Sequence, residues 1–374
     1  MKKRLLSLLL VLCLLASVAL GCVQPGEQPA EATAAPVNTE VPPTEAPIVT
    51  EVPPTEAPVE TEVPPTEPAE TEAPTAEPEP ARQGYRFADH EEAAKLLLSE
   101  RNYYEHLSQN DLNYRLQKLD ATLEELEAYI PTQMLDFTDA EKIAVDRTMQ
   151  TILTICEERG YRLPPLTDVV LAKTTMHEES DAGAYTHGTH IFLGEAMVAY
   201  ALYDNDAAQM YFLMILAHEL FHCLTRNNPD FRKDLYELFG FTVADEDFAI
   251  SPEIMDAVIS NPDVGHHDSY AAFEINGELK DCVVVFTAAP FEKPGDSFFN
   301  SMQTCLVPID SLDVMIPSED AANFWDVFGR NTGYVIDPEE TLADNFGMLI
   351  AYGTSLNYPT PELINAIDAY LKQR

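Results

Sequence analysis

Two histidines and a glutamate lie within five residues of one another in the stretch AHELFHC, residues 217–223. On a helix, residues four apart are separated by about 40° of rotation and about 6 Å of rise, so the imidazoles of His218 and His222 can bind one ion at about 2.0–2.1 Å. The carboxylate of Glu219 can reach a water on that ion, take its proton and pass it to a leaving amine. The pattern therefore predicts one catalytic Zn²⁺ ion with Glu219 as the base.

The alternative interpretation of these residues is a structural helix with capped core histidines and a surface glutamate. We expect a helix from Asp204 to Arg226 that is apolar nearly all round and therefore buried. Two histidines and a glutamate are costly on a buried helix unless they have partners, which favours the metal site. Cys223 points about 100° away from its neighbour His222, so we interpret it as a packing residue rather than a fourth ligand.

A catalytic zinc site needs a third protein ligand. No histidine follows in the x-x-G-x-x-H spacing, because Thr225 and Asn228 occupy the positions of its glycine and histidine. The C-terminal half instead offers Glu339 and Glu340 near the start of a helix predicted from Pro338 to Tyr352. Without a metal, these glutamates would be an acidic helix N-terminus that interacts well with the helix dipole.

With these two motifs the chain resembles the glutamate-zincin (gluzincin, thermolysin-like) zinc metallopeptidases. In that group a second helix bears a glutamate ligand with an aspartate four residues later, a spacing that Glu340 and Asp344 match. The resemblance implies Glu340 as the third ligand, and Asp344 can accept the free ring N–H of His218. Glu339 is the competing ligand, but Ala343 stands four residues after it, so Glu340 is favoured.

The resemblance implies a helix-rich α+β, zincin-like fold with a small β-sheet. The long separation of the two motifs predicts a β-containing insertion at about residues 244–316. The oxyanion of the tetrahedral intermediate needs a donor, for which Tyr334, His187, His266 and His267 are candidates, each with a surface or packing role as the alternative. By resemblance, the strand that carries His187 would border the cleft and pair with an extended peptide.

Local patterns predict the other elements that position these residues. They are two or three helices in 91–126, a capped helix from Thr138 to Glu158, a strand at 169–172, a second strand at 184–193 broken by a glycine, an Asn-Gly hairpin at 273–280, a buried strand at 283–286 and a helix at 361–372. The short sequences at 227–229 and 261–263 also resemble segments of bacterial lipoproteins that carry the same pair of motifs.

The N-terminal sequence predicts that the protein is exported and anchored to a membrane. Residues 1–21 have a basic start and an apolar run, typical of a secretory signal, and the Ala-Leu-Gly-Cys ending resembles a bacterial lipobox that lipidates Cys22. The alternatives are a signal peptide cut near Gly21 or an uncleaved anchor helix. Residues 22–81 repeat Pro, Thr and Glu and predict a disordered linker, which leaves 82–374 as the catalytic domain. We expect a bacterial protein held at the cell surface by the lipid on Cys22.

The net charge of −41, from 22 basic and 63 acidic residues, makes nucleic acid a poor partner. We expect a monomer that acts on a peptide or protein substrate. The sequence contains no C-x-x-C pair that would indicate a thiolate zinc site. It leaves undecided whether a disulfide joins Cys282 and Cys305. The functional prediction is a surface-anchored zinc metallopeptidase. The alternatives are a non-catalytic zinc-containing cell-surface binding or adhesion module and a hydrolase of a non-peptide cell-wall amide.

Overall fold

The computed structural model describes residues 84–374, so the signal peptide, Cys22 and the 22–81 linker lie outside the described residues. The helices are α2 (His90–Leu98), α3 (Arg101–Glu105), α4 (Gln109–Leu116), α5 (Leu123–Tyr129), α6 (Asp139–Glu158), α7 (Glu195–Leu202), α8 (Asp206–Asn227), α9 (Pro229–Leu238), α10 (Pro252–Met255), α11 (Phe324–Phe328), α12 (Pro338–Tyr352) and α13 (Pro361–Gln373). The strands are β1 (Tyr85–Phe87), β2 (Met134–Leu135), β3 (Val169–Thr174), β4 (Ala184–His187), β5 (His190–Gly194), β6 (Thr242–Val243), β7 (Ser269–Ile275), β8 (Glu278–Thr287), β9 (Gln303–Pro308) and β10 (Ile316–Pro317).

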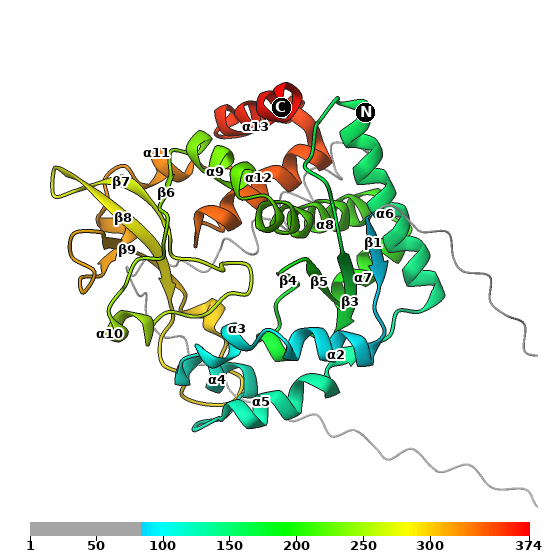
Figure 1. Ribbon diagram of the computed structural model, residues 1–374, viewed down its shortest axis with the longest axis horizontal. Coiled ribbons are helices and arrows are strands. Elements are labelled where there is room, and N and C mark those ends of the chain that lie inside the picture. Colours follow the sequence, from blue (N-terminus) through cyan, green and yellow to red (C-terminus); the bar gives the residue numbers. More distant parts are fainter. Residues whose placement is uncertain (1–83) are drawn as a thin grey trace, which may run out of the picture. The chain divides into compact units, whose positions relative to one another are not determined.

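The first sheet is mixed and runs in the order β1-β3-β5-β4, with β2 also paired to β3. Its central strand β3 is buried along its whole length and its side chains alternate between two faces. Leu171 packs into the core that contains α6 and α8, whereas Val170 and Ala172 pack into a second core with α2. Helices therefore cover both faces of this sheet (Figure 1).

Strands β4 and β5 form an antiparallel hairpin. The prediction of one strand over 184–193, broken by a glycine, is therefore wrong. Gly188 adopts a φ of +56°, a left-handed conformation that lets the chain reverse direction. As a result β4 becomes the edge strand of the sheet, with His187 at its end.

Helices α8 and α12 pack against each other and carry the two predicted motifs (Figure 1). Asn205 caps α8 by accepting from two backbone N–H groups, and α12 spans Pro338–Tyr352 as predicted. A Cβ at Gly347 would lie 2.6 Å from the carbonyl oxygen of Met214, so a glycine is needed for this close approach. By length and composition α8 could also cross a membrane, but 67% of its apolar window is buried within the protein.

The second sheet is antiparallel, in the order β10-β9-β8-β7-β6, and lies between α8 and α12 in the sequence. Its β7–β8 hairpin turns at Asn276 and Gly277, both with positive φ, which confirms the predicted Asn-Gly turn. The capping box of Thr138 and Glu141 is confirmed at the start of α6, and 91–126 contains parts of four short helices rather than two or three. The α+β fold class, with strands between the two motif helices, is confirmed.

The four cysteines of the described chain are buried free thiols. Cys282 on β8 pairs with Pro308, whereas Cys305 on β9 pairs with Val285. Because 282 and 285 differ by an odd number of positions, their side chains point to opposite faces of the sheet. The two thiols therefore lie in different cores, and the bridge that the sequence left open is not formed.

Candidate metal site

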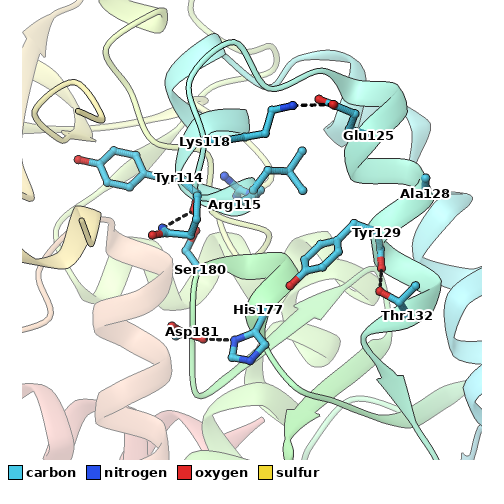
Figure 2. Close-up of a pocket in the computed structure, with 12 residues that line it drawn as sticks. Tyr114, Arg115, Lys118, Glu125, Ala128, Tyr129, Thr132, His177, Ser180 and Asp181 are labelled. Carbon is cyan, nitrogen blue, oxygen red and sulfur yellow. Dashed lines mark hydrogen bonds and ion pairs between the residues drawn. The ribbon is translucent and has the colours of Figure 1, made fainter. Parts of the chain in front are cut away.

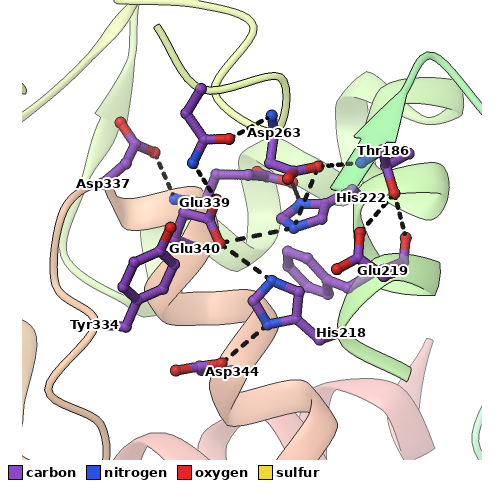
Figure 3. A network of polar contacts seen from close by, with 12 residues as sticks. Thr186, His218, Glu219, His222, Asp263, Tyr334, Asp337, Glu339, Glu340 and Asp344 are labelled. Carbon is purple, nitrogen blue, oxygen red and sulfur yellow. Dashed lines mark hydrogen bonds and ion pairs between the residues drawn. The ribbon is translucent and has the colours of Figure 1, made fainter. Parts of the chain in front are cut away.

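The two motif helices bring His218, His222 and Glu340 together in the interior (Figure 3). Nε2 of His218 lies 3.1 Å from Oε2 of Glu340, and Nε2 of His222 lies 3.9 Å from the same oxygen. All three residues are buried, and one ligand atom from each lies within 4.8 Å of the others. Two imidazole nitrogens and a carboxylate oxygen in this arrangement are a donor set that zinc binds.

A carboxylate contacts Nδ1 of each imidazole, so that Nε2 of each ring points toward the space between the three residues. Nδ1 of His218 lies 2.9 Å from Oδ1 of Asp344, the partner that the resemblance implied. Nδ1 of His222 lies 3.2 Å from Oε1 of Glu339. A carboxylate at Nδ1 fixes the tautomer that leaves Nε2 free to bind a metal. Glu339, considered above as a competing ligand, is thus placed as the residue that orients His222.

Glu339 is itself held in place by its neighbours. Its Oε1 accepts a hydrogen bond from Oγ1 of Thr225 and its Oε2 accepts one from the hydroxyl of Tyr236 at 2.7 Å. Although burial alone would raise the pKa of Glu339, the hydrogen bond and charge of His222, with other donors, lower it to about 2. The carboxylate is therefore ionised and its position is determined by three donors.

Nε2 of His222 is buried and has no hydrogen-bond partner among the described residues. A buried polar atom without a partner is costly, and such atoms in native proteins are uncommon. The atom faces the carboxylate oxygens of Glu340 at 3.9 Å and Asp263 at 3.8 Å, too far for a hydrogen bond. A cation bound between these groups would satisfy it, so the residues present fit a zinc ion.

The charges of the site favour a cation. Burial by itself lowers the pKa of His218, but hydrogen bonds and charges of Asp344 and Glu340 raise it well above its ordinary value. Burial raises the pKa of Glu340, but the hydrogen bond and charge of His218 outweigh it and lower that pKa. Since zinc binds neutral imidazole, a bound ion would take over the stabilising role of the proton on His218.

Glu219 lies beside the triad on α8. Its Oε2 accepts a hydrogen bond from Oγ1 of Thr186 on β4 at 2.8 Å. Burial raises the pKa of Glu219, and the charges of His218 and His222 oppose this rise. A buried carboxylate with a raised pKa, next to a metal site, is suited to taking up and releasing a proton.

Asp263 is a site residue that the sequence did not reveal. Its Oδ1 accepts a hydrogen bond from the backbone N–H of Thr186 at 2.8 Å, and with Glu219 and His222 it forms a second group of metal-binding type. Burial raises its pKa to about 8 against the charge of His222. In the same loop, Nδ2 of Asn261 donates to Oε1 of Glu340. Sequence spacing held no signal for these contacts, because the loop meets the helices only in the folded chain.

The oxyanion candidates are placed differently from one another. Tyr334 precedes α12 and lies near Glu340 in Figure 3, where burial and then the charge of Glu340 raise the pKa of its hydroxyl well above the ordinary value. His187 is not brought to the triad, because strand alternation points it to the opposite face from Thr186, against the rings of Tyr103 and Tyr104.

The remaining histidine candidates also lie elsewhere. His266 is exposed and its Nδ1 lies 3.3 Å from Asp247. The backbone N–H of His267 donates to the same aspartate, and its side chain is half-buried. Both residues contact Asp247 rather than the triad, so we assign neither of them to the metal site.

A hollow of about 440 Å³ lies away from the triad (Figure 2). It is bordered by α4, α5 and the 3-10 turn η2 (His177–Glu179). Within its lining, Lys118 pairs with Glu125 and His177 contacts Asp181, whereas Arg115 pairs with carboxylates outside it. Because none of the metal-site residues lines this hollow, we assign it no part in the chemistry.

Comparison of the chain with protein-family models, with curated proteins and with solved structures found no match. The likeness to glutamate-zincins therefore depends on the two motifs and on the geometry that brings them together.

Proposed function

We propose that the protein is a surface-anchored, zinc-dependent peptidase. The observation that carries the proposal is the convergence of His218, His222 and Glu340, with Nε2 of His222 buried and without a hydrogen-bond partner among the described residues. When bound, zinc would lower the pKa of a water and polarise the scissile carbonyl. The rest of the chemistry belongs to the side chains of this chain.

Glu219 is proposed to hold and move the proton. Its hydrogen bond from Thr186 fixes the carboxylate beside the triad, so that its oxygens can take a proton from water and deliver it to the leaving nitrogen. Tyr334 is the proposed donor to the oxyanion, because the raised pKa of its hydroxyl keeps the proton available near neutral pH. A binding or adhesion module with structural zinc would not need a buried carboxylate at position 219.

The activity can be tested with the full-length protein and two variants. Glu219→Gln removes the base but keeps the shape of the side chain, and Glu237→Gln is a matched change at an exposed position of α9. We expect all three proteins to bind one zinc per chain. Peptide-library cleavage should fall by about 10²–10⁴-fold in Glu219→Gln alone.

The outcomes separate the candidate functions. Absence of zinc from the wild-type protein would contradict the central claim. Zinc with no cleavage of peptides by any of the three proteins would favour the binding module, or a hydrolase that accepts only non-peptide amides. Cleavage that persists in Glu219→Gln would remove the proposed role of that residue.

The anchoring proposal depends on residues outside the described chain. If Cys22 carries lipid, Cys22→Ser should move the protein from the membrane fraction to the soluble fraction and abolish labelling by a fatty-acid analogue. Labelling that is unchanged in Cys22→Ser would contradict the lipid attachment, without bearing on the hydrolase.

A further inference from the structure

The loop Ser260–Asp263 lies along the edge strand β4, next to the metal site. Oδ1 of Asp263 accepts from the backbone N–H of Thr186 at 2.8 Å. Arg226 donates to the carbonyl oxygens of Thr186 at 2.6 Å and of Pro262 at 2.7 Å. Both backbone groups of Thr186 are thus used by the loop or by an arginine that holds the loop.

These backbone groups are the ones that an extended peptide would use. A substrate that pairs with the edge of a sheet needs unpaired N–H and C=O groups on the edge strand. Thr186 is the residue of β4 whose hydroxyl also holds the proposed base, Glu219, so pairing at this residue would place a peptide beside the base. The loop therefore occupies the backbone N–H that a peptide would need next to Glu219, and Arg226 on α8 occupies the carbonyl oxygen of the same residue.

The hollow that borders the loop is small. The hollow lined by Asn261, Asp263 and Tyr334 has a volume of about 50 Å³. Sites for small molecules are usually about 300–1,000 Å³, so this hollow can take a water molecule but not a peptide. A peptide could occupy this hollow only if the loop moved.

The loop is anchored by a buried charge network at its first residue. Asp111 accepts from the backbone N–H of Ser260 at 2.9 Å and from its hydroxyl at 3.0 Å. Arg115 donates to the carbonyl oxygen of Ser260 at 2.8 Å and forms buried salt bridges with Asp111 and Glu179. Because every polar group of Ser260 is paired, this end of the loop is fixed, and residues 261–263 are the part that can move away from β4.

We propose that the loop Ser260–Asp263 is an internal plug that keeps the hydrolase latent until the loop leaves the edge of β4. The inference rests on the proposed function, because it assigns a regulation to that site. Asp263 takes the place of a substrate carbonyl at the N–H of Thr186, and its carboxylate also lies 3.8 Å from Nε2 of His222. Opening of the loop frees the N–H of Thr186, the residue whose hydroxyl holds Glu219.

The plug can be tested by removing its contacts. The double variant Asn261→Ala/Asp263→Ala removes the bonds to Glu340 and Thr186. Asp263→Asn keeps an acceptor oxygen for Thr186, and Asp256→Ala changes an exposed aspartate in the preceding segment. The measurements are zinc content, affinity for a peptide hydroxamate by calorimetry, kcat/KM for a peptide, and hydrogen exchange of the β4 backbone.

The double variant should bind the hydroxamate and cleave the peptide at least tenfold better than the wild-type protein, with both quantities expressed per zinc ion bound. This factor follows because apparent affinity rises as the inverse of the fraction of open molecules, and a tenfold gain corresponds to a loop open in about a tenth of them. Asp256→Ala should stay close to wild type, and Asp263→Asn, which keeps an acceptor oxygen for Thr186, should not reproduce the gain of the double variant. The β4 amides should exchange faster only in the double variant.

Each outcome separates the plug from the proposed function. If no protein binds zinc, the proposed function fails, and hydrogen exchange alone decides whether the loop protects β4. If zinc is bound but hydroxamate affinity and kcat/KM are unchanged or lower in the double variant, the plug is overturned and the proposed function stands. If Asp263→Asn loses cleavage while its hydroxamate affinity is unchanged, Asp263 acts in catalysis and the plug is also overturned.

Discussion

The adjacent residues Glu339 and Glu340 are predicted to affect zinc binding to different extents. Oε2 of Glu340, the proposed ligand atom, lies 3.1 Å from Nε2 of His218, whereas Oε1 of Glu339 lies 3.2 Å from Nδ1 of His222, on the other side of that ring from Nε2. We expect Glu340→Ala to lose most of the affinity for zinc. We expect Glu339→Gln to weaken zinc binding more moderately, because the amide can still accept hydrogen bonds but loses its charge.

The expected magnitudes follow from the two roles. Structural zinc sites with four ligands bind with about 10–16 kcal/mol, so an equal share for each ligand is roughly 2.5–4 kcal/mol. At about 1.4 kcal/mol for each tenfold change, loss of the Glu340 ligand should weaken binding by about 10²–10³-fold. Loss of a carboxylate that orients a histidine ligand typically costs about 10–100-fold, which is the range that we expect for Glu339→Gln.

The assay is competition for zinc against a chromophoric chelator, with bound metal counted by mass spectrometry and folding checked by circular dichroism. Glu237→Gln, an exposed change on α9, is the matched control and should bind zinc like the wild-type protein. The reasoning is refuted if Glu339→Gln weakens binding more than Glu340→Ala does, since Glu339 would then be the ligand. Equal effects of Glu237→Gln and Glu340→Ala would show that the triad does not bind the ion.

Three further predictions concern the elements around the site. Gly347→Ala should destabilise the fold by about 1–3 kcal/mol and weaken zinc binding, because its Cβ would lie 2.6 Å from the carbonyl oxygen of Met214; unchanged denaturant midpoint and zinc affinity would contradict this. Burial holds the pKa of His187 well below 6.5, so as pH falls through about 6.5 the unfolded chain gains a proton that the folded protein does not. The free energy of unfolding should then fall by at most about 1.4 kcal/mol per pH unit. Urea titrations at several pH values should show a smaller fall in His187→Phe, and an equal fall in that variant and the wild-type protein would refute the assignment to His187. Burial raises the pKa of Cys282 to about 12, so this thiol and the buried Cys305 should react with a thiol reagent only after unfolding. Rapid labelling of either of these two thiols in the native protein would be inconsistent with their placement.

Local patterns were sufficient for the elements whose signals lie within a few residues. The capping box at Thr138, the Asn-Gly turn at Asn276 and the extent of α12 each depend on neighbours close in sequence, and the structure has them as predicted. The β4–β5 hairpin was missed because Gly188 can break a strand or reverse it, and only pairing with β5 decides between the two. The helices α7 and α9 were not predicted either.

The sequence by itself determined the chemistry available to this protein. Two histidines one helical turn apart, with a glutamate between them, define which atoms can share an ion, and a second acidic pair at the same spacing supplies the candidate ligand. The first follows from helix periodicity, which acts over a few residues, and the second is what the resemblance to the glutamate-zincins implies. Only the tertiary structure shows what these residues contact: Glu339 lies at Nδ1 of His222, and Asp263 accepts from the N–H of Thr186. These contacts join residues far apart in the chain, and they depend on how closely the helices and the loop pack, which no local spacing encodes.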